Sequence, residues 1–318
     1  MVSPLFLAFI LTGSFVINDD VNRWLDYKSN YHLNFSDLEE ERSRFNIFVD
    51  NIRSIEEHNM LYELGEVTWN QTINQYTHLT TEEFSEQIVG SLLMEEVDDE
   101  ERVDIVASAP LSIDWTIRGK VTPVKNQGQC GSCWAFSDVG ALESQYAIRH
   151  NALVQFSEQN LLDCAGSLYN CHGCNGGDPY NAFRYIRDIG IALERNYPYH
   201  GRQFSCQWNR GHFKIRSFGI LVRNEVAIKN KVGTYGPVSA TMNADALHFY
   251  HSGIVNSNRC NGQNNHAILI TGYGNYGGVP YWKIKNSWGR GWGEQGYFRL
   301  ISGRNMCGIN NYVTFPVL

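Results

Sequence analysis

Several kinds of residue are scarce in this 318-residue chain, and the absences exclude whole classes of protein. It has one long apolar run, at residues 4–17, which is too short to cross a bilayer core that takes about 20 helical residues. Charged residues make up only 19% against 43% hydrophobic, so a disordered chain is excluded, as is a collagen-like one. The composition is that of a globular protein.

Basic residues are scarce in the first third, and this divides the chain into two segments. Residues 1–108 hold 22 acidic and 6 basic side chains, a net charge of -16, whereas residues 109–318 hold 11 acidic and 20 basic, a net charge of +9. Cysteine is absent from the acidic segment, and all 8 cysteines lie from Cys130 onward. Residues 95–101 contain six acidic side chains, which is typical of a solvated linker where a protease can cut.

The apolar run at residues 4–17 has the length of the hydrophobic part of a signal peptide. We predict a signal peptide at residues 1–16, and a buried N-terminal strand or helix is the alternative. Entry into the secretory pathway permits disulfides. It also permits glycosylation at two Asn-X-Ser/Thr sites, Asn34 and Asn70.

Helical patterns come before strand patterns along the chain. In residues 36–58 the apolar positions recur at helical spacing, and Ser36 with Glu39 predicts a capping box at the start of this helix. Residues 133–149 also predict a helix. Residues 266–271 form a short apolar run that ends at Gly272, and residues 281–285 alternate as a half-buried strand does. This order predicts an α+β fold with two subdomains and a cleft between them.

Cys133 is the strongest candidate for a nucleophile. It follows Gly131 and Ser132 and begins the predicted helix, where the positive end of the helix dipole favours a thiolate. A thiolate attacks carbonyl carbon in acyl transfer but needs a base or an imidazolium partner. His266 is one candidate among 10 histidines. Two Cys-X-X-Cys units, at 130/133 and 171/174, leave a zinc site or a redox motif as alternatives.

The chain resembles the papain-like cysteine peptidases of the cathepsin L-like kind, from about residue 22 to its end. The resemblance rests on motifs in the family's order, namely VTPVKNQGQCGSCWAF at 121–136, SEQ at 157–159, CNGG at 174–177, NHA at 265–267 and KNSWG at 285–289. His266 lies 133 residues after Cys133, and Asn286 lies 153 after it, which is the family's spacing. The resemblance implies a papain-like peptidase domain at residues 109–318, with a helical left lobe and a β-barrel-like right lobe.

The resemblance also assigns catalytic roles. Cys133 would attack the peptide carbonyl as a thiolate paired with the His266 imidazolium, and His266 would protonate the leaving amine. Asn286 would orient the imidazole through its amide oxygen. Gln127 would donate a hydrogen bond to the oxyanion, beside the backbone N–H of Cys133. Trp288 would cover the Asn286–His266 bond. Neither a metal nor a cofactor is expected.

Three disulfides are implied by the resemblance: Cys130–Cys174, Cys164–Cys206 and Cys260–Cys307. Cys171 is left over, and it is an inert thiol, a rearranged partner of Cys130, or the site of an intermolecular bond.

The substrate-binding residues that the resemblance implies are Gly176, Gly177, Asp178, Pro179, Thr241, Asn265, Trp288 and Tyr312. Asp178 replaces a residue that is commonly apolar, and Tyr312 is bulky for the floor of the second subsite. Asp178 therefore predicts either a pocket that accepts a basic side chain or a solvated carboxylate at its rim.

Residues 17–108 resemble the family's inhibitory prodomain, of the I29 kind. Its interrupted helical motif is complete and lies on one helical face, with Glu40, Arg44, Phe48, Asn51, Ile55 and Asn59. A second motif is kept only in part, and His78 stands where the family has Asp. We hypothesise that the opposite charges of the two segments attract each other. Acid would then release the prodomain, as carboxylates with a pKa near 4 and His78 with a pKa near 6.5 gain protons.

The sequence therefore predicts a cysteine endopeptidase that is made as a zymogen and activated in acid, in the lysosome or outside the cell. Its expected partners are peptide substrates, its own prodomain and cystatin-like inhibitors. A monomer that binds neither nucleic acid nor membranes is expected. A catalytically silent papain-like binding protein is the alternative.

Overall fold

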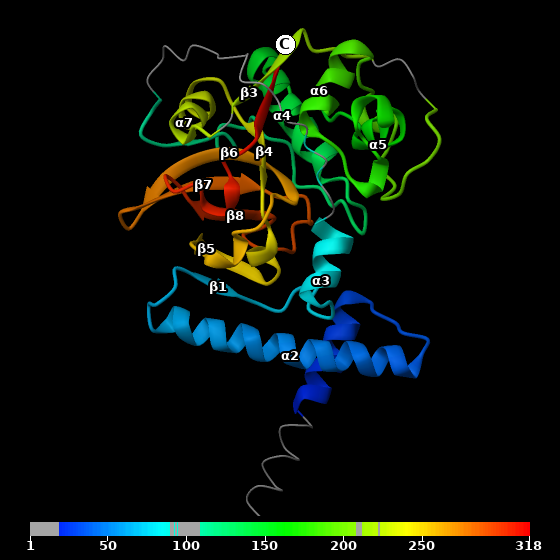
Figure 1. Ribbon diagram of the computed structural model, residues 1–318, viewed down its shortest axis with the longest axis vertical. Coiled ribbons are helices and arrows are strands. Elements are labelled where there is room, and N and C mark those ends of the chain that lie inside the picture. The colour runs from blue at the N-terminus through cyan, green and yellow to red at the C-terminus, as the bar shows by residue number, and fades with distance from the viewer. Residues whose placement is uncertain (1–18, 90–91, 93, 95–108, 208–211, 222) are drawn as a thin grey trace, which may run out of the picture.

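The computed structural model describes residues 19–89, 92, 94, 109–207, 212–221 and 223–318. The predicted signal peptide and the acidic run at 95–104 lie outside the described residues. Within the described ranges, no helix is long and apolar enough to cross a membrane. Figure 1 shows residues 19–89, which the resemblance assigns to a prodomain, at one end, and the two lobes of residues 109–318 at the other. The helical lobe, called the left lobe in this family, lies on the right in this view.

The left lobe is built around the helix predicted at residues 133–149. This helix, α4 (Cys133–His150), is buried along most of its length and packs against α6 (Pro179–Asp188) and α5 (Glu158–Cys164). Asp178 caps α6 with its side chain. Pro179 is the first helical residue, a position where the backbone N–H has no partner within the helix, so proline loses no hydrogen bond there. Short 3₁₀ turns connect these helices at Ser167–Tyr169, Gly173–Asn175 and Glu194–Asn196.

The right lobe is built around a sheet. Helix α7 (Glu225–Thr234) packs against strand β6 of this sheet. The strand order is β1-β5-β8-β7-β6-β4-β9-β3, β2 pairs with β6, and every pair is antiparallel except β5 with β8. The strands are β1 (Trp69–Gln71), β2 (Ile113–Asp114), β3 (Ser217–Leu221), β4 (Val238–Met242), β5 (Tyr250–Val255), β6 (His266–Tyr276), β7 (Val279–Lys285), β8 (Tyr297–Ile301) and β9 (Val313–Val317). Three 3₁₀ turns lie at Asp245–Leu247, Asn258–Cys260 and Met306–Gly308.

Strand β6 is longer than the sequence predicts. The prediction ended it at Gly272, but the strand continues through that glycine to Tyr276. Gly272 is there because β2 packs closely against it, and a Cβ at this position would lie 2.2 Å from the Ile113 carbonyl oxygen. The glycine marks a close approach of two backbones rather than the end of a strand.

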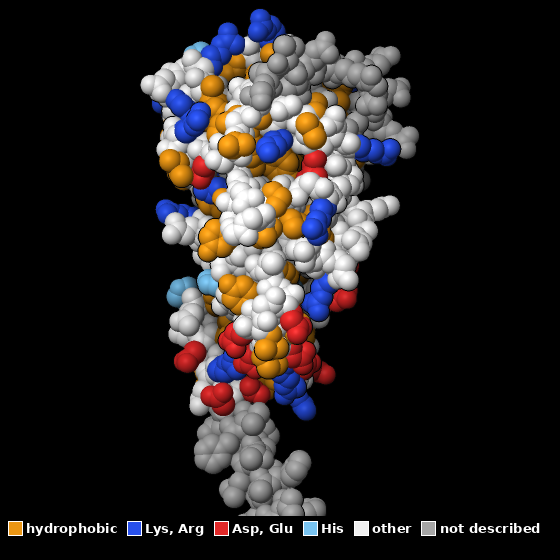
Figure 2. Space-filling model, turned by 90° about the vertical axis from the view of Figure 1, so that its left-hand side faces the viewer, with side chains coloured by type: hydrophobic (Ala, Val, Ile, Leu, Met, Phe, Trp, Pro, Cys, Tyr) orange, Lys and Arg blue, Asp and Glu red, His pale blue; other side chains and the backbone are white. Residues whose placement is uncertain are grey.

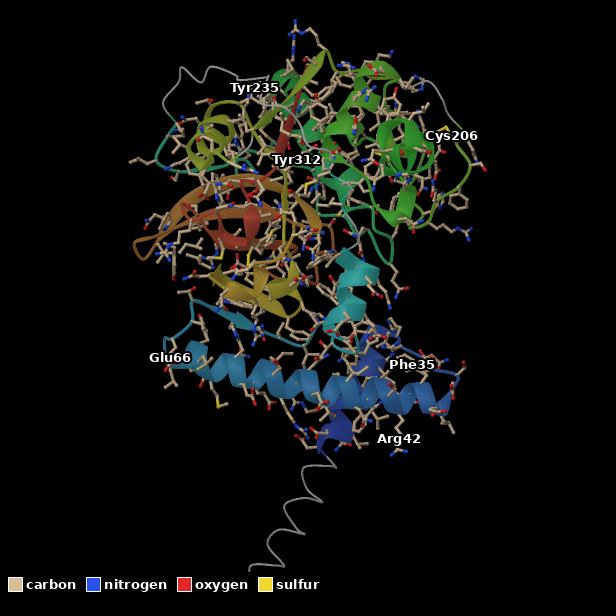
Figure 3. All side chains as sticks on the ribbon, in the orientation of Figure 1. Phe35, Arg42, Glu66, Cys206, Tyr235 and Tyr312 are labelled. Carbon is tan, nitrogen blue, oxygen red and sulfur yellow. A yellow bond between two sulfur atoms is a disulfide. The ribbon has the colours of Figure 1, made fainter. Side chains whose placement is uncertain are left out.

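The prodomain lies across the end of the right lobe. Residues 19–31 are helical, and α2 (Leu38–Glu63), α3 (Thr81–Phe84) and a π-helical turn (Ser85–Val89) follow. Figure 3 labels Phe35 and Arg42 near one end of α2 and Glu66 beyond the other. Strand β1 pairs with β5, with Trp69 opposite Gly253, so the prodomain adds a strand to the sheet of the enzyme.

The capping box predicted at Ser36 and Glu39 is wrong. Helix α2 is capped by Asp37, whose extended backbone lets its carboxylate accept a hydrogen bond from the Glu39 N–H. A capping box does occur, but at Thr80 and Glu83, where α3 begins.

The prodomain motif on α2 holds the rest of the prodomain by hydrogen bonds to its backbone. Asn51 donates to the carbonyl oxygens of Thr77 and Leu79, both at 2.9 Å. Asn59 exchanges two hydrogen bonds with Gln71, at 2.8 and 2.9 Å. The motif thus ties α2 to β1 and to the segment that leads into the active site.

Candidate active site

Cys133 lies at the first position of α4 and is completely buried. Its thiol donates to the carbonyl oxygen of Val89, at 3.5 Å, so the end of the prodomain covers the candidate nucleophile. This burial raises the pKa of the Cys133 thiol to about 11, although nearby backbone groups, of Ala267 first, oppose the shift.

His266 and Asn286 meet where β6 begins and β7 ends. The Nε2 of His266 lies 2.9 Å from the Oδ1 of Asn286, which also accepts the Ser287 N–H at 2.8 Å. Because an amide oxygen only accepts, Nε2 carries a proton, and in the neutral ring Nδ1 is left as the base. The Nδ1 atom makes no hydrogen bond among the described residues. Trp288, completely buried, packs against the imidazole with ring centroids 4.8 Å apart and the ring planes tilted by 31°.

The closed site favours a neutral cysteine–histidine pair. Burial lowers the pKa of His266 to about 4, while the hydrogen bond to Asn286 and the nearby Val89 carbonyl raise it. Together with the raised pKa of Cys133, this keeps a thiol and a neutral imidazole under the prodomain. The thiolate–imidazolium pair that the sequence predicts therefore stays a prediction for the uncovered enzyme.

The side chain of Gln127 is held in one orientation by bonds at both ends of its amide. Its Oε1 accepts from the Ser287 hydroxyl at 2.5 Å. Its Nε2 donates to the carbonyl oxygens of Cys130 at 3.0 Å and Ile88 at 2.7 Å. Ile88 belongs to the prodomain. A prodomain carbonyl therefore accepts the hydrogen bond that the resemblance assigns to the oxyanion of the substrate.

The prodomain makes further contacts along the active-site cleft. Phe84 packs edge-on against Trp288 with centroids 5.2 Å apart, and Gln75 donates to the Trp288 carbonyl at 2.9 Å. Beyond the thiol, Leu92 forms a parallel bridge with Gly177. Gly177 has no room for a side chain, since a Cβ would lie 2.7 Å from the Trp134 ring.

Asp178 is fully buried, so the alternative of a solvated carboxylate at the pocket rim is wrong. Its carboxylate accepts from the Tyr180 N–H at 2.9 Å and the Asn181 amide at 3.1 Å. The Tyr312 hydroxyl, from the residue directly before β9, donates to it as well, at 2.8 Å. Two predicted subsite residues that lie 134 residues apart in the sequence are thus brought together.

The other predicted subsite residues are divided between the cleft and its surroundings. Gly176, Gly177 and Pro179 lead into α6, and buried Thr241 accepts a hydrogen bond from Asn264 at 2.8 Å. Asn265 instead bonds to the 243–245 loop, to Asp245 at 2.8 Å and Ala244 at 2.9 Å. Sequence reasoning missed Asn264, because nothing in the sequence shows that the two neighbouring asparagines, which precede β6, point to different partners.

Three disulfides join the pairs that the resemblance implies, namely Cys130–Cys174, Cys164–Cys206 and Cys260–Cys307. Cys171 is buried and unpaired by sulfur, its thiol donating to the Tyr169 carbonyl, and burial raises its pKa. Since Cys130 and Cys174 are bonded together, the two Cys-X-X-Cys units do not form a zinc site. No group of three potential metal ligands occurs in the part of the chain that the structure describes.

The two predicted glycosylation sites have different surroundings. Asn34 is exposed in the loop before α2. Asn70 is half-buried in β1, where its Oδ1 accepts from the N–H and the hydroxyl of Ser252 at 3.0 and 2.8 Å. Asn34 is the more accessible of the two.

Comparison with known proteins identifies the class of this protein. Residues 109–317 match the papain family cysteine protease domain, and residues 24–84 match the cathepsin propeptide inhibitor domain (I29). The chain therefore belongs to the papain family of cysteine proteases and carries its propeptide inhibitor in front of the enzyme domain. The fold class and the peptidase function predicted from the sequence are confirmed.

Within this family, the chain is similar to cathepsin L-like enzymes over nearly its whole length. A cathepsin L-like proteinase of Phaedon cochleariae is 40% identical over 95% of this chain and 96% of the relative. Digestive cysteine proteinase 1 of Homarus americanus is 40% identical over 93% and 94%. The structure of digestive procathepsin L 3 from Tenebrio molitor larval midgut is 37% identical, with a TM-score of 0.84 over 94% of this chain and 99% of that chain.

Proposed function

We propose that Cys133, His266, Asn286 and Gln127 hydrolyse peptide bonds through an acyl-enzyme. Cys133 Sγ attacks the carbonyl carbon, its proton resides on His266 Nδ1, and the oxyanion accepts from Gln127 Nε2. His266 then gives the proton to the leaving amine as the C–N bond breaks. Water, deprotonated by His266, attacks the thioester, releases the acid product and restores the thiol.

The contact between Ile88 and Gln127 carries this proposal. A peptide carbonyl lies 2.7 Å from Gln127 Nε2, and the next carbonyl along the chain lies 3.5 Å from the Cys133 thiol. The prodomain thus places ordinary peptide groups where a substrate's peptide group would react.

We propose that activation removes residues 17–108, after loss of a signal peptide at 1–16, and leaves residues 109–318 as a monomeric enzyme. The start of the protease match at residue 109 supports this boundary. A secretory route, ending in the lysosome or outside the cell, is supported by the three disulfides. Cystatin-like inhibitors would bind the same uncovered cleft, and glycans would be carried by Asn34 before Asn70.

The second subsite is proposed to be shaped by Asp178 without binding a cation. Three donors from within the protein bond to its carboxylate, and Tyr312 is one of them. Asp178→Asn should therefore leave the ratio of kcat/KM for substrates with lysine and leucine at the second position unchanged within about threefold. A large loss of lysine cleavage alone would show that Asp178 binds basic side chains.

Incubation of the purified proenzyme in acid tests the proposed function. The wild-type protein should lose mass down to a chain beginning near residue 109, whereas Cys133→Ser should remain intact under the same conditions. A peptide epoxide should label only the processed wild-type protein. If the wild-type protein neither processes nor reacts, the chain is instead the catalytically silent binding protein.

A further inference from the structure

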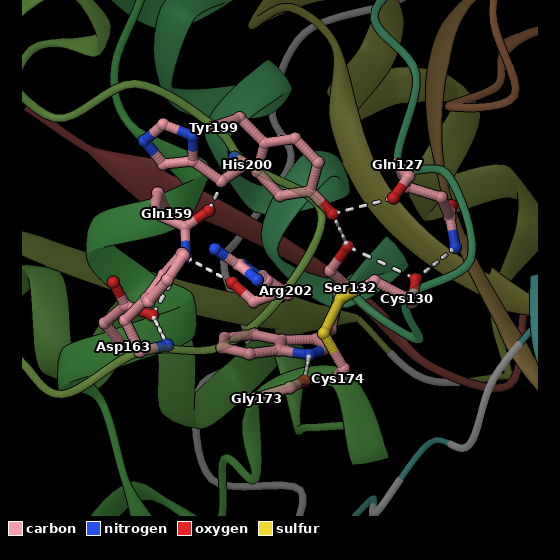
Figure 4. The surroundings of a disulfide bond; sticks show 12 residues. Gln127, Cys130, Ser132, Gln159, Asp163, Gly173, Cys174, Tyr199, His200 and Arg202 are labelled. Atoms are coloured by element: carbon pink, nitrogen blue, oxygen red, sulfur yellow. Dashed lines mark hydrogen bonds between the residues drawn. A yellow bond between two sulfur atoms is a disulfide. The ribbon is translucent and has the colours of Figure 1, made fainter.

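A tyrosine hydroxyl outside the four proposed catalytic residues connects the two sides of the active site. Tyr199 lies in the left lobe, in the segment after the 3₁₀ turn Glu194–Asn196. Its hydroxyl donates to the backbone carbonyl of Gln127 at 2.8 Å and lies 2.7 Å from the Ser132 hydroxyl (Figure 4). The Tyr199 hydroxyl oxygen thus connects Gln127, the proposed oxyanion donor, with Ser132, the residue directly before Cys133.

The protons in this chain of hydrogen bonds have one arrangement. A carbonyl oxygen cannot donate, so the Tyr199 proton must point to Gln127. The Ser132 hydroxyl must then donate to the Tyr199 oxygen, because that oxygen has no second proton. The only other acceptor near Ser132 in the described structure is the Cys130 carbonyl, at the longer distance of 3.4 Å.

Ser132 gives up its usual role to make this contact. Serine before the first residue of a helix ordinarily caps a free backbone N–H with its side chain. Ser132 occupies that position at the start of α4 but makes no such bond. Its hydroxyl is directed to Tyr199 instead, so the start of the nucleophile's helix is fixed from the side.

The Tyr199 ring is itself held in place. It packs edge-on against Phe136, with centroids 4.8 Å apart, and its backbone N–H donates to Glu194 at 3.0 Å. Burial raises the pKa of the Tyr199 hydroxyl, so it stays protonated and able to donate wherever the enzyme works. A rigid donor of this kind can fix a distance between two loops.

We propose that Tyr199 is a positioning residue, which holds Gln127 at the right separation from Cys133 and so stabilises the oxyanion of the transition state. The proposal rests on the catalytic roles proposed above for Cys133 and Gln127. Errors of about 1 Å in such an arrangement cost up to about 100-fold in rate, and an oxyanion donor contributes about 10²–10³. Loss of one supporting hydroxyl should cost part of that.

Tyr199→Phe tests this without removing the ring. In the processed enzyme, with active sites counted by epoxide titration, kcat should fall about 5- to 30-fold while KM changes less than about twofold. Affinity for a peptide aldehyde, whose adduct carries an oxyanion, should fall by the same factor as kcat. The rate of Cys133 alkylation by iodoacetamide should stay within about twofold.

Tyr197→Phe is the matched control. Tyr197 lies two residues before Tyr199 in the same segment. Its hydroxyl also donates to a buried acceptor, Asp163 at 2.9 Å, but makes no contact with the proposed catalytic residues. This variant should keep wild-type kcat and aldehyde affinity. Equal kcat in the two variants would overturn the proposal, because Tyr199 would then contribute only to stability.

A double-mutant cycle with Gln127→Ala identifies the route of the effect. If Tyr199 acts through Gln127, then Tyr199→Phe should change kcat less than about twofold once Gln127 is alanine. An undiminished loss in that background would also overturn the proposal. Failure of the proposed function has a different result, namely wild-type kcat in Gln127→Ala alone.

Discussion

Lys125 lies between two buried carboxylates beneath the active site, where the lobes meet. Its Nζ is 2.6 Å from Glu158 and 3.0 Å from Glu143, and both glutamate side chains are only 1% exposed. Burial lowers the pKa of Lys125, but the two carboxylates more than reverse this and raise it, so it stays charged. Burial raises the pKa of Glu158, which Lys125 opposes.

Removing this cation should be costly. Lys125→Met leaves two carboxylates close together in the interior, and we expect the free energy of unfolding to fall by about 3–5 kcal/mol. The measurement is urea unfolding of the Cys133→Ser proenzyme, in which self-cleavage is prevented. The control is Lys283→Met, which breaks a partly exposed pair with Asp114 and should cost about 0–1 kcal/mol. Equal decreases in the free energy of unfolding in the two variants would show that the buried carboxylates do not depend on Lys125 for their stability.

Among the single residues of the active site, the sequence predicts those that lie in recognisable motifs. It misses the residues that hold them in place. Cys133, His266, Asn286 and Gln127 could be named because each lies in a motif of fixed spacing. Ser132, Ser287 and Tyr199 could not be given roles. Tyr199 contacts Gln127 over a separation of 72 residues, and no local pattern indicates which of the 17 tyrosines will reach it.

Two histidines lie by the prodomain segment that approaches the active site, His78, which is half-buried, and His248, which is buried. The first of them corrects the hypothesis about acid. His78 bonds to the Tyr27 hydroxyl at 2.8 Å, and burial, with Arg44 nearby, lowers its pKa to about 4. The hypothesis expected His78 to gain a proton near pH 6.5. With this lowered pKa, His78 stays neutral at that pH in the closed protein. On the enzyme side, His248 is stacked between Phe84 and Phe249, with centroids 4.1 and 3.9 Å away.

The surroundings of His248 oppose its protonation. Its Nε2 bonds to the Tyr76 carbonyl at 2.9 Å, and Nδ1 has no partner among the described residues. Burial, and then His78, lowers the pKa of His248 to about 4, while the Tyr76 carbonyl raises it. Because the closed form depresses this pKa, closure is most stable above pH 6.5 and weakens as the pH falls toward 4.

Acid should therefore open the prodomain partly through His248. If its pKa returns to about 6.5 on release, protonation favours the open form about 30-fold at pH 5. In His248→Phe, which keeps the stacking, the processing rate should rise less steeply between pH 6.5 and 4.5. The rate at each pH is divided by the activity of the mature enzyme at that pH.

His251→Phe provides the control for this experiment. His251 lies three residues further on, exposed on β5, and its substitution should leave the pH dependence of processing unchanged. If His248→Phe also follows the wild-type curve, the acid response must reside in other groups.

Elements follow from the sequence where their signals are local. The helix at 133–149 and the strand at 281–285 were predicted nearly to their ends. Strand β1 was not predicted, because its three residues become a strand only by pairing with β5, about 180 residues away. The end of β6 was missed because Gly272 serves a contact with β2 that the sequence does not reveal.

In the part of the molecule that the structure describes, the opposite charges of the two segments do not meet as ion pairs. Figure 2 shows acidic side chains gathered at the prodomain end. Among the residues described, every ion pair lies within residues 19–89 or within residues 109–318. The described contacts between the two units are hydrogen bonds between uncharged groups and aromatic packing, so the structure gives no support to the hypothesis of electrostatic attraction.

Salt should therefore have little effect on prodomain release. Between about 0.05 and 0.5 M NaCl, which screens exposed charges strongly, the processing rate at a fixed acid pH should change less than about threefold. Each rate is corrected for the effect of salt on the mature enzyme. An increase of tenfold or more would mean that attraction between the two segments holds the protein closed.

The central claim is that the catalytic residues are assembled in the proenzyme and covered by the carbonyl groups of Ile88 and Val89. The most direct test is iodoacetamide alkylation of Cys133 at pH 7, followed by mass spectrometry of its peptide before and after prodomain removal. The account predicts that Cys133 in the intact proenzyme reacts at least about 100-fold more slowly than in the processed enzyme, while buried Cys171 stays unreactive in both. Equal reactivity of Cys133 in the two forms would contradict it.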